Sequence, residues 1–205
     1  MSALIGGAPL DRVRSELFNA GNDWQIELSS AAVASFASTV ERLYDEMPAR
    51  LAESTSATAA VGSALSEARA ASHEVGFSAA LPVAERALAR LVLSTLGGAE
   101  NPIAATEQWL ANRGATSSEA VARYLGEVLG QYARHVVDRE AGRLAERSIG
   151  AATSAALSTE LAAGARQLAS AAYSPAAVGE QLSARWSQLV SAAFEAGAAL
   201  PRRAQ

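Results

Sequence analysis

Residues 116–147 read TSSEAVARYLGEVLGQYARHVVDREAGRLAER, and this stretch decides the expected fold. It opens with Thr116-Ser-Ser-Glu119, the form of a capping box, in which the hydroxyl accepts a free backbone N–H and the carboxylate reaches back to the cap. Apolar residues then recur at spacings of three and four, so they share one side of a helix. These residues are Val121, Tyr124, Leu125, Val128, Leu129, Tyr132 and Val136. The pattern predicts a long central helix over about 116–147.

A second side of this helix carries small residues, Gly126, Gly130 and Ala133, followed by Val137. Glycine inside a helix costs about 1 kcal/mol relative to alanine, so two glycines four residues apart indicate close packing against another helix. We therefore expect an all-α, alanine-rich bundle of six to eight helices around the central one. The sequence contains no internal repeat of about 20–50 residues, so a solenoid is not expected.

The composition fits a single helical domain. The chain has 205 residues, of which 50% are hydrophobic but only 5% aromatic, so alanine must supply much of the interior. It contains no cysteine, which excludes disulfides, thiolate metal sites and a cysteine nucleophile. We expect an N-terminal arm over 1–28, a helical bundle over 29–200 and a tail over 201–205.

The charge of the chain argues against several classes of partner. All 17 basic residues are arginines, so a Schiff-base lysine is excluded, and the net charge is −4. Since the arginines do not cluster as in a nucleic-acid-binding protein, binding to DNA or RNA is not expected. Residues 1–7 lack the features of a signal peptide, and the most apolar stretch, 87–96, is too short to span a membrane. We expect a cytoplasmic protein and leave peripheral membrane contact open.

The N-terminal arm carries the single strand-like pattern of the sequence. Asp11 can cap a short helix, and Trp24, Ile26 and Leu28 then alternate with polar residues, as in a half-buried strand. One interpretation is an extended linker that places Trp24 and Ile26 in the helical core. The other is a strand that pairs with a second subunit or another protein, which makes Trp24, Ile26 and Leu28 candidate partner-binding residues.

Local signals divide the rest of the chain into helices. Ser29 or Ser30 begins a long helix that Pro48 should kink or end, because proline lacks the N–H that a helix needs. Asn101-Pro102 begins a short helix, with an N-cap followed by proline at the first position. Between them, residues 83–96 are apolar around most of the circumference, which favours a central position.

Evidence for catalytic chemistry is thin. Glu127, Gln131, His135 and Asp138 align on one side of the central helix, but a single helix supplies too few ligands for a metal site. His135 could act as a base, but the sequence shows no residue outside its own helix that would orient it. We therefore expect no cofactor and no metal, and an enzyme centred on His135 is the least favoured class of function.

Arginines replace the apolar stripe at the end of the central helix, where Arg139, Arg143 and Arg147 follow one another at intervals of four. Burying three unpaired guanidinium groups would be very unfavourable. This end either projects into solvent or docks on an acidic surface of a partner or of another copy. Arginine suits such a contact, since its planar fork pairs with carboxylates through two hydrogen bonds.

These observations predict a non-catalytic binding or assembly subunit that acts through protein–protein contacts, within an oligomer or a larger complex. The main alternative is a small-molecule or lipid-binding bundle, in which the apolar surface of residues 83–96 would line the pocket.

Overall fold

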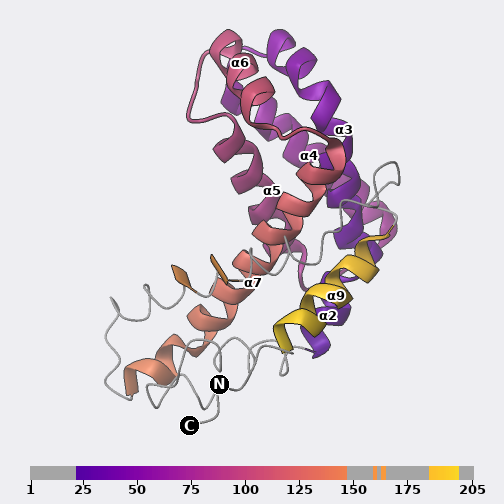
Figure 1. Ribbon diagram of the computed structural model, residues 1–205, viewed down its shortest axis with the longest axis vertical. Helices are drawn as coiled ribbons and strands as arrows, with labels where there is room; N and C mark the ends of the chain where they lie inside the picture. Colours follow the sequence, from indigo (N-terminus) through magenta and orange to yellow (C-terminus); the bar gives the residue numbers. More distant parts are fainter. Residues whose placement is uncertain (1–21, 147–158, 161–162, 165–184, 199–205) are drawn as a thin grey trace.

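The computed structural model describes residues 22–146, 159–160, 163–164 and 185–198. These residues form seven helices and no strand, which confirms the predicted all-α bundle (Figure 1). The helices are α2 (Asn22–Leu28), α3 (Ala31–Glu53), α4 (Ala57–Val75), α5 (Leu81–Thr95), α6 (Pro102–Asn112), α7 (Ser117–Glu146) and α9 (Trp186–Ala198). The predicted short helix after Asp11 and the tail over 201–205 lie outside the described residues.

Helix α7 is the predicted central helix, and its bounds differ from the expected ones by a single residue at each end. The Thr116 hydroxyl accepts the backbone N–H of Glu119 at 3.1 Å, as in a capping box. The Glu119 carboxylate accepts the N–H of Ala115 at 2.8 Å, one residue earlier than the standard motif. The helix packs on α5 and α3, and its C-terminal part runs beyond the other helices drawn in Figure 1.

Helix α3 shares the centre of the bundle with α7. It packs against α4, α5, α6, α7 and α9, and Ser30 caps its start by accepting the N–H of Val33. Of the two expected effects of Pro48, a kink or an end, the end does not occur, because α3 continues to Glu53. The carbonyl left without a helical donor belongs to Tyr44, and it accepts Arg113 Nη1 at 2.5 Å and Trp109 Nε1 at 3.4 Å.

One core runs through the described helices and contains mainly alanine, leucine and valine. Trp186 and Tyr124 are among its largest fully buried side chains, and Trp109 is 5% exposed. Gly126 and Gly130 of α7 are buried as well, as close helix packing requires. Within the described part of the chain, no helix is both long and apolar enough to cross a membrane.

The expected extended segment at residues 24–28 is wrong, because these residues form helix α2. Alternation over only five residues fits a helix as well, since Trp24 and Leu28 are one turn apart and face the same side. Leu28 is completely buried and Trp24 packs on the core, whereas Ile26 is 71% exposed on the opposite side. Residues 22–28 thus pack on the bundle, and strand addition through them is excluded in this structure.

Candidate partner-binding surface

Helix α2 contacts α7 through tilted aromatic rings. The Trp24 ring lies 4.9 Å from the His135 ring and 5.5 Å from the Tyr132 ring, measured between centroids. Tyr132 in turn lies 5.7 Å from Phe194 of α9. These contacts place one side of the Trp24 ring in the core and leave the side chain partly exposed.

A second set of contacts holds α2 against α9. Trp186 Nε1 donates to the Leu28 carbonyl at 2.6 Å, in a buried position at the end of α2. Gln25 Nε2 donates to Ser191 Oγ at 3.1 Å. An open groove between the two helices is lined mainly by polar side chains, and Ile26 stands at its edge. The groove therefore combines hydrogen-bonding groups with apolar surface.

The loop between α4 and α5 is attached to α2 through Glu27. The Ser78 hydroxyl donates to the Glu27 carboxylate at 2.6 Å, and the N–H of Ala79 donates to the same oxygen at 2.8 Å. Ser78 is 2% exposed, whereas the bond from Ala79 lies at the surface. Phe77, the residue before Ser78, is nevertheless 88% exposed. The loop is thus held in place while its one aromatic side chain lies in solvent.

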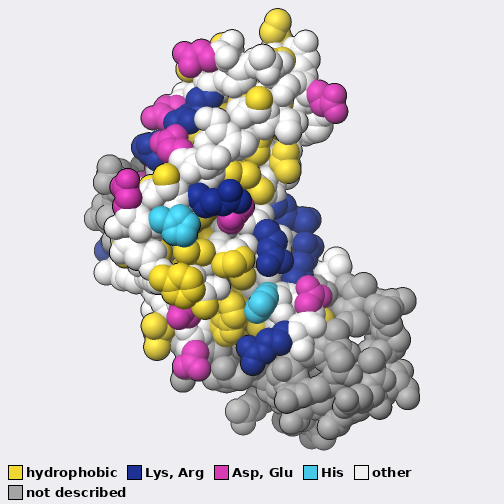
Figure 2. Space-filling view, turned by 180° about the vertical axis from the view of Figure 1, so that it is seen from behind, with side chains coloured by type: hydrophobic (Ala, Val, Ile, Leu, Met, Phe, Trp, Pro, Cys, Tyr) yellow, Lys and Arg dark blue, Asp and Glu magenta, His cyan; other side chains and the backbone are white. Residues whose placement is uncertain are grey.

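The loop that carries Phe77 is attached to the side of α2 from which Trp24 projects. Trp24 and Glu27 are three residues apart in a helix and so share a side, and Glu27 holds the loop that carries Phe77. Figure 2 shows apolar side chains gathered between the two histidines of the chain, with arginines along one border of this area. Val75, at the end of α4, adds a side chain that is 54% exposed.

Two exposed arginines from different helices lie beside His135. Arg86 belongs to α5, where its Nε donates to the Pro82 carbonyl at 3.1 Å, and Arg139 follows His135 by one turn on α7. Burial lowers the pKa of His135 below its ordinary value, and the positive charges of Arg86 and Arg139 lower it further, while Asp138 opposes them. We call the surface formed by Trp24, Phe77, Arg86, His135 and Arg139 the α2 face.

The α2 face contains only part of the predicted site. Trp24 and Arg139 belong to it, whereas Leu28 is in the core and Ile26 points away toward α9. Helix α7 includes Arg143, but its side chain is not among those described, and Arg147 lies outside the described residues. Sequence reasoning missed Phe77 and Arg86. The one available signal for Phe77 was a large aromatic residue placed between Gly76 and Ser78 in a junction.

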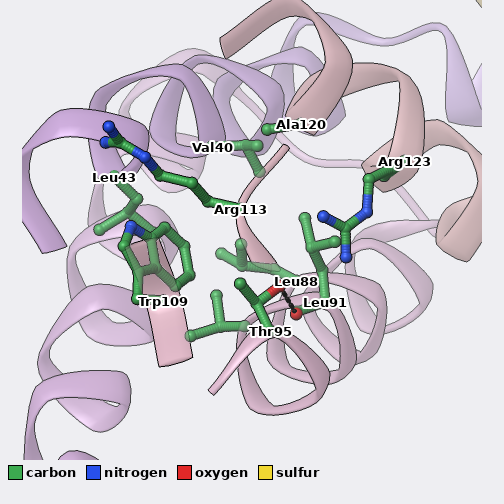
Figure 3. A pocket seen from close by; sticks show the side chains of 10 residues that line it. Val40, Leu43, Leu88, Leu91, Thr95, Trp109, Arg113, Ala120 and Arg123 are labelled. Atoms are coloured by element: carbon green, nitrogen blue, oxygen red, sulfur yellow. Dashed lines mark hydrogen bonds between the residues drawn. The ribbon is translucent and has the colours of Figure 1, made fainter. Parts of the chain in front are cut away.

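A small cavity lies at the other end of the bundle, where α5 meets α3 and α6. Figure 3 shows aliphatic side chains and the Trp109 ring around it, with Arg113 and Arg123 on opposite sides. Its interior has room for about 10 Å³ of water, the space of a single molecule. Both arginines donate to backbone carbonyls, Arg113 to Tyr44 and Arg123 to Asn112. The cavity is therefore a small packing gap, and the two arginines at its edge are already hydrogen-bonded to the backbone.

Two of the four polar residues aligned on α7, Glu127 and His135, make contacts with other helices. Glu127 pairs with Arg90 at 3.2 Å, and the His135 ring contacts the Trp24 ring at a tilt. Among the described side chains, no three of His, Asp or Glu converge as metal ligands would. No known family model, curated protein or solved structure matches this chain.

Proposed function

We propose that this protein is a non-catalytic binding or assembly subunit that contacts a protein partner, or a second copy of itself, through the α2 face. The observation that carries the proposal is Phe77, an aromatic side chain that is 88% exposed on a loop anchored to α2 by two hydrogen bonds. Burying such a side chain contributes about 1.5–3 kcal/mol. Aromatic residues are also the ones that most often dominate protein–protein interfaces.

The anchoring of the loop supports this function, because a binding residue that is already ordered loses little entropy when a partner docks. The Glu27 carboxylate accepts two hydrogen bonds from the loop, from Ser78 and Ala79. Glu27 itself stands on a helix that is fixed to both α7 and α9. A loop needed only to connect α4 with α5 would not require an exposed phenylalanine.

The alternative of a ligand-binding bundle has less support. Residues Leu88, Leu91 and Val92 of α5 do line the cavity of Figure 3, as that alternative requires. Pockets for small organic ligands, however, measure about 300–1,000 Å³. A ligand of that kind would have to separate α5 from α3 and α6 before it could enter.

Site-specific photo-cross-linking in the cells that make the protein tests the proposal. The photoreactive residue p-benzoylphenylalanine replaces Phe77, and in a matched control it replaces Ile103, which is 73% exposed on α6. Figure 1 places α6 and α2 at opposite ends of the described helices. We expect a discrete protein adduct from position 77 and none of the same mass from position 103. Absence of an adduct at 77, or equal adducts from both positions, would contradict the proposed function.

A further inference from the structure

The arginines of this protein differ in whether they have carboxylate partners. Arg42 and Arg50 both pair with Glu67, Arg69 pairs with Glu85 and Arg90 with Glu127. Arg86 and Arg139 make no ion pair within the part of the chain that the structure describes, although both are exposed. Arg123 also makes no ion pair among the described residues, but it donates to the Asn112 carbonyl at the far end of the bundle, whereas Arg86 and Arg139 both lie beside His135.

The surroundings of His135 combine positive charge with apolar surface. Two guanidinium groups and one carboxylate, that of Asp138, act on its ring, so the local balance of charge is positive. The Trp24 ring contacts the histidine ring at a tilt of 59°, and Phe77 lies on the loop that Glu27 of the same helix anchors. A complementary surface must therefore present carboxylates and apolar side chains next to one another.

We infer that the α2 face binds an acidic amphipathic segment of the partner, whose carboxylates pair with Arg86 and Arg139 and whose apolar side chains cover Phe77 and Trp24. This inference rests on the proposed function and specifies the chemistry of the partner. Arginine forms two parallel hydrogen bonds with a carboxylate, so two arginines on different helices also define the spacing of the partner's acidic groups.

The distribution of acidic residues favours a protein segment over an anionic membrane. Asp23, Glu74 and Asp138 are exposed and lie within a few residues of Trp24, Phe77 and Arg139 respectively. A continuous anionic lipid surface would bring phosphates against these carboxylates as well as against the arginines. A segment with spaced carboxylates can meet the arginines alone.

The test extends the cross-linking experiment with two double variants. Arg86→Gln with Arg139→Gln removes the two charges of the α2 face, and Arg42→Gln with Arg69→Gln removes two charges elsewhere on the surface. Circular dichroism melting of both variants checks that they fold. We expect the adduct from position 77 to fall about tenfold in the first variant, as the loss of two charge pairs implies, and to persist in the control.

Three further measurements identify the chemistry of the partner. Mass spectrometry of the adduct locates the cross-linked segment, which should carry aspartate or glutamate beside apolar residues. In cell extract, an excess of a synthetic amphipathic peptide of leucine and glutamate should suppress the adduct, whereas the same peptide with glutamine in place of glutamate should not. Co-sedimentation with phosphatidylglycerol vesicles gives the membrane comparison.

The outcomes separate the two proposals. If position 77 gives no adduct, the proposed function itself fails. If an adduct forms but is equally strong in both double variants, or if its segment lacks carboxylates, the protein contact stands and the acidic-segment inference is wrong. Sedimentation with the vesicles that depends on Arg86 and Arg139, in the absence of a protein adduct, would assign the surface to lipid.

Discussion

Pro48 and Arg113 are linked through one backbone carbonyl, that of Tyr44. Proline at position 48 removes the N–H that would bond to Tyr44 four residues earlier, and the Arg113 guanidinium takes its place at 2.5 Å. The same guanidinium lies 4.1 Å from the centroid of the Tyr44 ring. A residue expected to interrupt α3 thus creates the acceptor that joins α3 to the end of α6.

Replacing Arg113 with methionine should therefore destabilise the fold, because the Tyr44 carbonyl loses its best donor. A carbonyl left unsatisfied in a partly buried position costs about 1–3 kcal/mol, which urea denaturation followed by circular dichroism would measure. In a Pro48→Ala background, where the helix supplies an N–H again, the same substitution should cost less. Equal losses in both backgrounds would show that Pro48 and Arg113 act independently.

Gly114→Ala should destabilise the turn between α6 and α7. Gly114 has φ +92°, and a Cβ there would lie 3.0 Å from Cδ of Glu119, the side chain that accepts the Ala115 N–H. Together these effects should lower the free energy of unfolding by about 1–3 kcal/mol. Gly62→Ala is the matched control, since Gly62 is helical with open space around it, and it should be neutral or stabilising.

Trp186→Phe should cost more stability than Trp109→Phe. Trp186 is 1% exposed, and its Nε1 donates to the Leu28 carbonyl at 2.6 Å. No other donor to this carbonyl occurs among the described residues. Trp109 Nε1 makes a 3.4 Å bond to the Tyr44 carbonyl, which Arg113 already satisfies. We expect about 1–2 kcal/mol for Trp186→Phe and under about half of that for Trp109→Phe in thermal or urea unfolding. The reverse order would contradict these roles.

His135 should titrate below the ordinary histidine value of about 6.5. Burial first, then Arg86 and Arg139, disfavour its protonated form in the folded protein. The unfolded chain therefore binds more protons as the pH falls below about 6.5, so this histidine lowers stability from there down to its folded pKa, below which the effect is constant. NMR titration of the imidazole signals measures the folded pKa directly.

Arg86→Gln supplies the variant that tests this prediction, because it removes one positive charge without touching α7. The pKa of His135 should rise toward its ordinary value, and the pH dependence of stability should become shallower. Arg42→Gln, on α3, is a control that should leave the His135 signal unchanged. A pKa that does not respond to Arg86 would mean that the two groups do not interact, and would weaken the positive character assigned to the α2 face.

The starts of the helices could be read from the sequence because capping is local. Ser30, Asn101 and Thr116 each accept an N–H two or three residues later, so the donor and the acceptor both lie within one short stretch. The long apolar stripe that begins at Val121 likewise predicts α7 by itself, since many residues repeat the same period. Residues 24–28 were too few to distinguish a strand from two turns of helix.

The candidate site depended on contacts between residues far apart in the chain, which no local pattern records. The loop of Phe77 is held on the helix of Trp24 because Glu27 anchors it across 51 or 52 positions of sequence, and Arg86 acts on His135 because α5 packs on α7. The sequence by itself determined the helical class and the capped helix starts, and it indicated Arg139 as a candidate binding residue. Only the tertiary structure decided that Pro48 leaves α3 intact, because the missing bond is replaced by Arg113 from another helix.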